Sequence, residues 1–202
     1  MRIALLVSLT FLLAADDKAP LNRTRDREVD IHHMKINVTV DLKAKSVYGH
    51  VTHTLSPLSA SLKSFALDAE DMTIRRVRHK DKDILFDHSG DKLYITLDNE
   101  VGWNDTLNIR IDYTSFPRVG VFFVSPDEIY PDKPWQAWTQ GEMTDNHHWV
   151  PMYDYPNERN TFEILLTVDK KLKAVSNGEL ISVKDNSDGT HTWHWHEHFP
   201  MV

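Results

Sequence analysis

The sequence predicts an all-β fold, and three observations lead to that prediction. Apolar residues recur at every second position over several short segments, which is the period of a strand with one buried face. Turn-forming residues separate these segments at fairly even spacing. Beyond the first fifteen residues, no segment has the 3.6-residue apolar period of an amphipathic helix. Short strands joined by turns indicate a sandwich or large open antiparallel sheets.

Alternation places the expected strands in chain order. They cover residues 36–42, 47–55, 93–97, 107–113 and 163–168. Turns are expected at 56–57, 87–91, 98–100 and 177–178. The last of these is Asn-Gly, a dipeptide typical of hairpins because both residues accept positive φ. Residues 127–155 are rich in Pro, Trp, Tyr and His without alternation, so we predict a long, aromatic-packed functional loop.

Composition limits the classes of function. The chain has 202 residues, 41% of them hydrophobic, which suits one domain with a real core plus a short targeting segment. Its formal charge of −7 argues against nucleic acid as a partner. The basic run from Arg75 to Lys80 is followed at once by Asp81, so we interpret it as a solvated strand end. The absence of cysteine excludes disulfides, Cys-type zinc sites and thiol chemistry.

The first fifteen residues differ from the rest of the chain. Arg2 precedes an apolar run over residues 3–13, and Ala14 and Ala15 follow it. This order is typical of a secretory signal peptide, and the run is too short to span a bilayer comfortably. We therefore expect residues 1–15 to be a signal peptide and the protein to be exported, periplasmic or extracellular. No stable membrane span is expected after cleavage, although an uncleaved signal would associate the protein with a membrane.

Six segments in a fixed order resemble the N-terminal domain of the M1 family of zinc aminopeptidases, the family of aminopeptidase N. They are REVDIHHMKI (27–36), LDAEDMTI (67–74), PRVGVFFV (117–124), WTQGE (138–142), WVPMYDYP (149–156) and VSNG (175–178). The resemblance implies a flexible lead-in over 16–27 and one domain over 28–202. It also implies a saddle-like antiparallel β-sandwich that covers one side of an active-site cleft. Since the chain stops inside the family pattern, we expect it to be truncated before a catalytic domain.

The resemblance assigns substrate binding to Gln140 and Glu142, which match the family residues that hold the free amino group of a peptide. The chemistry is reasonable, because an α-ammonium group needs a carboxylate and an amide oxygen that point the same way. Residues i and i+2 of an extended chain share a face. The implied partners are a peptide N-terminus and the missing catalytic domain. Asp154 is expected to fix the loop by hydrogen bonds.

The family holds its catalytic zinc with His-Glu-x-x-His and a later Glu, beside a Gly-x-Met-Glu-Asn loop. Neither motif occurs in this sequence. The resemblance therefore implies zinc only in the intact protein, and we assign no catalytic residue and no metal ligand here. This chain is expected to be inactive by itself.

Clusters of histidine allow a different hypothesis, in which the protein binds a metal ion. His194, His196 and His198 share one face of a predicted strand, which would suit an adventitious metal site or a metal-scavenging protein. The pair 147–148 is expected to lie in the loop. The pair 32–33 is expected on a strand, where neighbours point to opposite faces. The main rival function is a stand-alone exported β-sandwich that binds peptides or proteins through its Trp- and Tyr-rich loop. A domain that packs on another should instead expose apolar surface.

Overall fold

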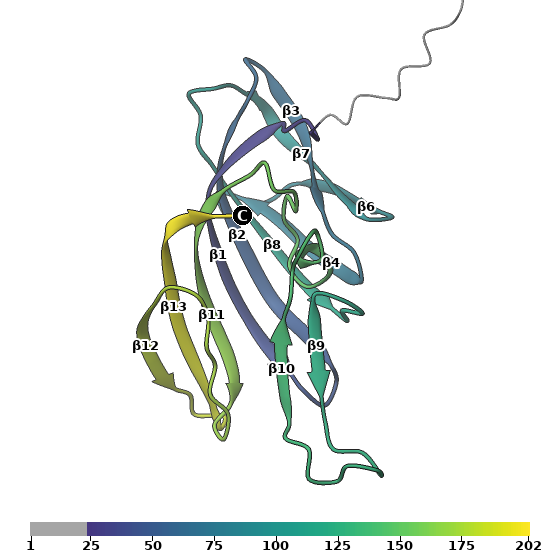
Figure 1. The fold of residues 1–202 in the computed structure, drawn as a ribbon. Coiled ribbons are helices and arrows are strands. Elements are labelled where there is room, and N and C mark those ends of the chain that lie inside the picture. The colour runs from purple at the N-terminus through teal and green to yellow at the C-terminus, as the bar shows by residue number, and fades with distance from the viewer. Residues whose placement is uncertain (1–23) are drawn as a thin grey trace, which may run out of the picture.

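The computed structural model describes residues 24–202, and these form three β-sheets (Figure 1). The predicted signal peptide lies outside the described residues, as does most of the predicted lead-in. The strands are β1 (Val29–Asp41), β2 (Ser46–Pro57), β3 (Leu62–Asp68), β4 (Met72–His79), β5 (Lys82–Asp83), β6 (Leu85–Ser89), β7 (Lys92–Val101), β8 (Leu107–Ser115), β9 (Val121–Val124), β10 (Gln136–Thr139), β11 (Asn160–Asp169), β12 (Glu179–Asp185) and β13 (Thr190–Met201). One 3₁₀ turn, η1 (Asn146–His148), interrupts them. In the described part of the chain, no helix is long and apolar enough to cross a membrane.

The largest sheet has eight strands in the order β12-β13-β11-β1-β2-β8-β4-β5. Its pairs are antiparallel except for β1 and β11, which run parallel with His33 opposite Thr161 and Thr39 opposite Thr167. The all-β prediction is confirmed. The parallel pair is an addition to the antiparallel pattern, because β11 returns to the open edge of β1 after the long segment that follows β8.

The core lies between the concave large sheet and the two smaller sheets, β3-β7-β6 and β10-β9. Every second side chain of the strands points into this core. In β8, for example, Leu107, Ile109, Ile111 and Tyr113 are all buried. Side chains of a buried sheet face each contribute about 1.5–3 kcal/mol of transfer free energy. Period-2 patterning therefore accounts for both the strands and the side on which they pack.

All five strands predicted by alternation are present, but some turn predictions are wrong. Residues 56–57 end β2, with the bend after them at 58–60, and residues 98–100 continue β7 instead of turning. Residues 177–178 do bend, with a φ of 86° at Gly178, but they precede β12 and do not join a hairpin, whose turn follows β12 at 186–189.

Segment 67–74 divides between two strands: β3 ends at Asp68, Asp71 has a φ of 54°, and β4 begins at Met72. This break carries part of the site described below.

The predicted loop over 127–155 is largely irregular, as expected, but it contains β10 and η1. Strand β10 pairs with β9 from Gln136 opposite Val124 to Thr139 opposite Val121. The two strands form an arm that stands in front of the large sheet (Figure 1). The arm leads into the turn that carries the predicted substrate-binding residues.

Candidate functional site

The predicted substrate-binding residues lie in the anchor loop, residues 140–145, directly after β10. The Gln140 amide donates a hydrogen bond to the carbonyl of Gly120 at 3.0 Å, which ties the start of the loop to the segment before β9. The Asp145 amide donates to the carbonyl of Gly141, also at 3.0 Å, and closes the loop on itself. Two backbone hydrogen bonds therefore fix its path before any side chain is considered.

Two glycines make this path possible. Gly120 has a φ of 79°, and a Cβ there would lie 2.1 Å from the carbonyl oxygen of Asp145. A Cβ on Gly141 would lie 2.2 Å from the side chain of Asn146. Glycine is required at 120, where the neighbour is backbone and φ is positive, whereas at 141 a larger residue would displace the Asn146 side chain.

Gln140 and Glu142 are both exposed. Neither side chain makes a hydrogen bond within residues 24–202, so their oxygen atoms are free to accept from a cation. Beside them, Trp138 stacks on Phe122 with ring centroids 4.6 Å apart. The arrangement presents an amide and a carboxylate at the end of a short, aromatic-supported hairpin.

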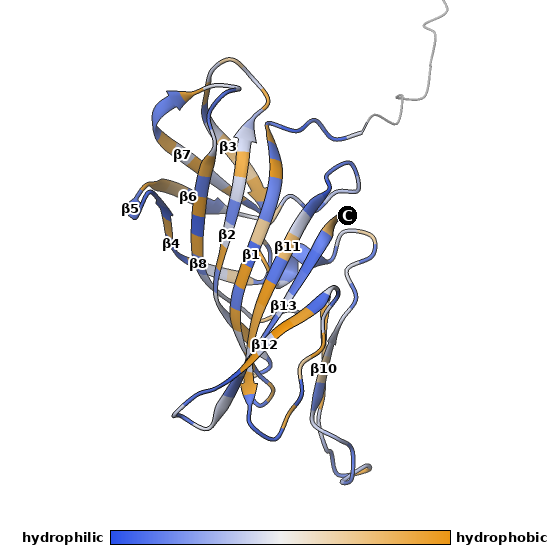
Figure 2. Cartoon of the chain, turned by 90° about the vertical axis from the view of Figure 1, so that its left-hand side faces the viewer, coloured by the Kyte–Doolittle hydropathy of each residue, from blue (hydrophilic) through white to orange (hydrophobic). Residues whose placement is uncertain are grey.

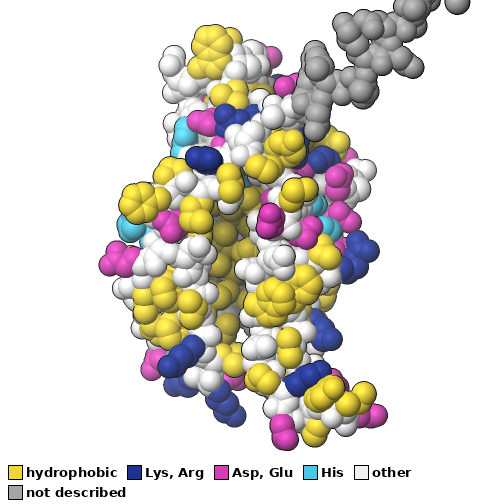
Figure 3. Space-filling model, viewed as in Figure 1, with side chains coloured by type: hydrophobic (Ala, Val, Ile, Leu, Met, Phe, Trp, Pro, Cys, Tyr) yellow, Lys and Arg dark blue, Asp and Glu magenta, His cyan; other side chains and the backbone are white. Residues whose placement is uncertain are grey.

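An apolar groove of about 420 Å³ runs behind the arm. The large sheet contributes Ile36 and Ile164 to it, and the arm contributes Ala137 and Trp138. Figure 3 shows hydrophobic side chains in the hollow between the β11–β13 side and the β9–β10 arm. Gln140 and Glu142 are not among the lining residues, so the groove adjoins the anchor loop without containing the polar pair.

A second polar group follows the anchor loop, and we call it the polar junction. It joins the end of β3 and the turn after it to η1 and the segment beyond. Its members are Asp68, Glu70, Asp71, His147, His148 and Asp154. Backbone pairs frame it, since Asp68 and Met152 exchange hydrogen bonds of 2.7 and 3.0 Å.

The two histidines of the polar junction lie side by side. Their ring centroids are 4.5 Å apart with an interplanar angle of 32°. Both histidines occupy the 3₁₀ turn η1 inside the loop where they were expected. The expectation that Asp154 fixes the loop is confirmed, since its Oδ2 accepts from the His147 amide at 3.0 Å and from Nδ1 at 2.9 Å.

Electrostatics favour ionised carboxylates in the polar junction. Burial raises the pKa of Asp68, but hydrogen bonds from Arg25, Lys92 and the Asp154 amide lower it, and the net shift is downward. Burial likewise raises the pKa of Asp71, and Arg118 and His148 more than reverse it. Burial lowers the pKa of His147, yet its contact with Asp154 makes the net shift upward.

The β13 histidine row, His194, His196 and His198, does share a strand face, as predicted. The rings of His196 and His198 are 4.0 Å apart, and His194 Nε2 lies 2.6 Å from Glu163 Oε2. The row does not form a group of converging metal ligands; within the described residues, the one such group is Glu70, His147 and His148. The i, i+2 spacing of the row suggested a metal site in the sequence. The group that does converge could not be recognised in this way, because its residues are far apart in the chain.

The zinc of M1 peptidases does not fit this chain. The sequence lacks both the His-Glu-x-x-His and the Gly-x-Met-Glu-Asn motifs, and Glu70 comes from a turn between strands. No step of zinc-dependent peptide hydrolysis can therefore be derived from these residues.

Comparisons with known proteins agree on one family. The model of the peptidase M1 N-terminal domain matches residues 30–202. The chain is 24% identical over 178 residues to leucine aminopeptidase 2 of Vanderwaltozyma polyspora, covering 85% of this chain and 27% of that protein. It is 25% identical over 183 residues to leukotriene A-4 hydrolase of Xenopus laevis, covering 83% of this chain and 29% of that protein. The chain thus spans less than a third of these curated relatives.

Solved structures share the fold. A mutant M1 zinc metallopeptidase of Deinococcus radiodurans bound to a Tyr-Ser-Ala substrate superposes with a TM-score of 0.74 at 19% identity. That match covers 88% of this chain and 41% of the other. Native leukotriene A4 hydrolase of Saccharomyces cerevisiae gives a TM-score of 0.71 at 16% identity, over 86% of this chain and 27% of that chain.

Proposed function

Because the chain belongs to the peptidase M1 N-terminal domain family, we propose that it is the amine-anchoring domain of a zinc aminopeptidase. In this proposal Gln140 and Glu142 hold the α-ammonium group of a peptide substrate. The zinc and the residues that cleave the peptide bond would come from a catalytic domain packed on this one. The observation that carries the proposal is the anchor loop, which presents a free carboxylate and a free amide on a rigid backbone.

The chemistry of the anchor loop suits an ammonium group. Glu142 supplies a negative charge and Gln140 supplies a neutral acceptor, and both can accept from the three donors of a protonated amine. A charge-assisted hydrogen bond contributes about 1.5–3 kcal/mol. The backbone hydrogen bonds at Gly120 and Gly141 reduce the entropy that binding would cost.

Exposed apolar surface supports packing against a further domain. Strand β12 is the edge of the large sheet, and its Leu180, Ile181 and Val183 are 40–46% exposed. Figure 2 shows this hydrophobic stretch on the open side of the sheet. An apolar, unpaired edge is unusual for a free-standing domain. This observation favours the aminopeptidase domain over a stand-alone binding module.

The test is binding of two tripeptides that differ only at the N-terminus. Trialanine with a free amine is titrated into the ¹⁵N-labelled chain, and N-acetylated trialanine serves as the matched ligand. We expect amide shifts over residues 138–145 with the free amine alone. Glu142→Gln should weaken that binding about 10- to 150-fold, the equivalent of one charge-assisted hydrogen bond.

The control variant is Glu128→Gln, which removes one exposed carboxylate from the tip of the β9–β10 arm. It has the same net charge as Glu142→Gln, so it separates a local contact from a general charge effect. Equal shifts with both tripeptides, or equal weakening by both variants, would contradict the proposal.

Export is a further part of the proposal, based on residues 1–15 alone. Fusing these residues to a cytoplasmic reporter should carry it out of the cytoplasm. Replacing three leucines of the apolar run with lysine should retain it inside. Retention of the unaltered fusion would overturn the assignment.

A further inference from the structure

Three side chains of the polar junction converge on one point. His147 Nε2 lies 3.7 Å from Glu70 Oε2, and His148 Nε2 lies 3.8 Å from the same oxygen. All three candidate ligand atoms lie within 4.8 Å of one another. Ligands about 2.0–2.2 Å from a tetrahedral zinc ion stand roughly 3.3–3.5 Å apart, so small side-chain movements would complete the geometry.

The other ring nitrogen of each imidazole, Nδ1, lies at hydrogen-bond distance from a carboxylate. His147 Nδ1 lies 2.9 Å from Asp154 Oδ2, and His148 Nδ1 lies 2.9 Å from Asp71 Oδ2. Donation from Nδ1–H to a carboxylate fixes the tautomer and leaves the lone pair on Nε2. Metal-binding histidines are typically oriented in this way by a carboxylate behind the ring. The polar junction has this arrangement twice.

The convergence suits a cation. With both Nδ1 atoms facing carboxylates, the two Nε2 atoms and the Glu70 oxygen face one point, where either a proton or a metal ion would be held between them. Arg118 Nη2 contacts the other oxygen of Glu70, Oε1, at 3.1 Å. Glu70 thus has one oxygen paired with Arg118 and the other directed at the imidazoles.

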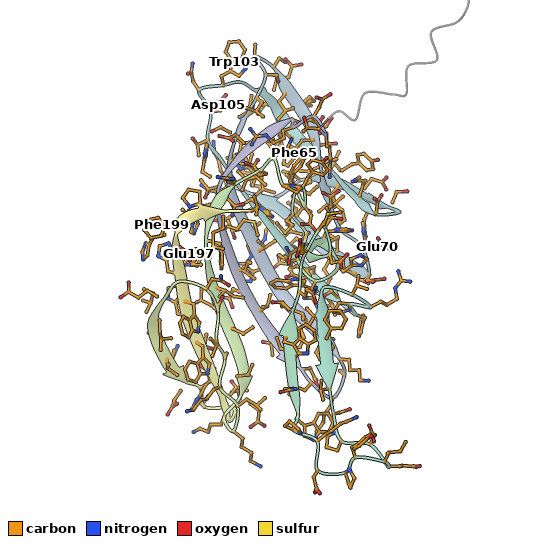
Figure 4. All side chains as sticks on the ribbon, viewed as in Figure 1. Phe65, Glu70, Trp103, Asp105, Glu197 and Phe199 are labelled. Atoms are coloured by element: carbon orange, nitrogen blue, oxygen red, sulfur yellow. The ribbon has the colours of Figure 1, made fainter. Side chains whose placement is uncertain are left out.

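We propose that Glu70, His147 and His148 bind a zinc ion. Two imidazoles and one carboxylate are a ligand set that zinc accepts, with a fourth position open to water. The side chain of Glu70 is 36% exposed, which leaves a path for the ion from solvent. Figure 4 shows Glu70 at the surface beside β4. The ligands come from the β3–β4 turn and from η1, so this site is separate from the zinc site of the M1 peptidases.

The consequence of binding is a crosslink. The Glu70 amide already donates to the His147 carbonyl at 3.0 Å, and zinc would add three bonds across the same boundary. Since η1 directly follows the anchor loop, the ion would hold that loop against the β3–β4 turn. The site uses neither Gln140 nor Glu142, so it does not depend on the proposed peptide binding.

The test is a zinc titration of the untagged chain in competition with a chromophoric chelator at neutral pH. We expect one tight equivalent of Zn²⁺ per chain. His148→Ala should lower the affinity at least about 100-fold by removing a ligand, and Glu70→Gln should lower it about 10- to 100-fold. Glu70→Gln is the variant that keeps the fold safest, because its side chain is the most exposed of the three.

Two controls decide the position of the ion. The triple change of His194, His196 and His198 to Ala should leave the affinity unchanged, because the β13 histidine row lies elsewhere. Long-range ¹H–¹⁵N spectra of the imidazoles should show that zinc shifts Nε2 of His147 and His148 while Nδ1 keeps its proton. Unchanged binding in both His148→Ala and Glu70→Gln, or loss of binding in the triple variant, would overturn the proposal.

Discussion

The polar junction and the β13 histidine row are the two histidine-rich regions of this protein, and they are built differently. In the polar junction each imidazole has a carboxylate behind it, and both imidazoles face a third. In the row, the rings of His196 and His198 contact each other at a tilt of 42°, and of the three only His194 is held by a carboxylate at hydrogen-bond distance, that of Glu163. Figure 4 places Glu70, in the junction, and Glu197, in β13, on opposite sides of the molecule.

The difference teaches that the number and spacing of histidines do not by themselves make a binding site. A strand places alternate side chains side by side along one face, so they do not converge on one point. Convergence requires elements that approach from different directions, and here the β3–β4 turn meets η1. We therefore expect substitutions in the polar junction to have larger effects than substitutions in the row, and the predictions below test this order.

The largest expected effect is at Asp68, which anchors the polar junction to its surroundings. Its side chain is 5% exposed and contacts Arg25 at 2.5 Å, Lys92, and the Asp154 amide at 2.9 Å. Asp68→Ala would leave two cations and an amide without their acceptor. We expect a loss of about 3–5 kcal/mol in the free energy of unfolding, measured with urea at pH 7.

The matched control for Asp68 is Asp83→Ala. Asp83 also forms an ion pair, with Arg76 at 3.2 Å, but its side chain is 64% exposed. Such pairs contribute roughly 0–1 kcal/mol. If both changes destabilise the chain equally, burial does not explain the importance of the polar junction.

Much of the fold could be predicted from the sequence, because alternation of apolar residues records directly which strand face is buried. All five alternating segments are strands for this reason. The parallel pairing of β1 with β11 could not be predicted, since it depends on where a distant strand returns. Nor was the break between β3 and β4 at Asp71 predicted, although the apolar alternation changes phase there, from Leu67 and Ala69 to Met72 and Ile74.

The candidate sites differ in the same way. Gln140 and Glu142 were proposed from a short local segment, WTQGE, that resembles the family. The metal-binding group could not be found in this way, since Glu70 is 77 positions before His147 and no spacing rule connects them. The pair His147–His148 was visible and expected in the loop, but its side-by-side rings depend on the 3₁₀ turn η1. Turn-forming residues at Asp145 and Asn146 are consistent with that turn.

The second prediction concerns His53, which ties the large sheet to the segment that follows η1. It is fully buried, and its Nε2 bonds the Pro151 carbonyl at 2.9 Å. Burial lowers the pKa of His53 from 6.5 to about 4. Between these values the unfolded chain binds the proton and the folded chain does not, so stability falls as pH falls. We expect a loss of about 3 kcal/mol between pH 6.5 and 4.

The variant His53→Gln tests this pH dependence, because glutamine can still donate to the Pro151 carbonyl but does not titrate. Urea unfolding at pH 7, 5.5 and 4 should give a flatter profile for the variant than for the unaltered chain. Burial also lowers the pKa values of His33 and His50, but both histidines are present in both proteins, so they cancel in the difference. Parallel profiles would exclude His53 as the cause.

The third prediction is at Glu163, the main acceptor beside the β13 histidine row. It contacts Lys35 Nζ at 2.9 Å and His194 Nε2 at 2.6 Å. Burial raises the pKa of Glu163, but these partners lower it overall, so its contribution is present above pH 4.5 and is lost on acidification. Glu163→Gln should cost about 1 kcal/mol at pH 7 by thermal or urea unfolding. A loss as large as that of Asp68→Ala would abolish the contrast between the two regions.

The smallest expected effect is at His198, at the exposed end of the row. Its side chain is 53% exposed, and its nearest carboxylate, Glu179, is 72% exposed and 3.7 Å away. Because solvent screens so open a pair, His198→Ala should change the free energy of unfolding by less than about 0.5 kcal/mol. Urea unfolding at pH 7 should give this small difference. A loss above about 1 kcal/mol would mean that the contact between the rings of His196 and His198 stabilises the strand. In that case the row would be a structural element in its own right, instead of a set of solvated side chains on a strand.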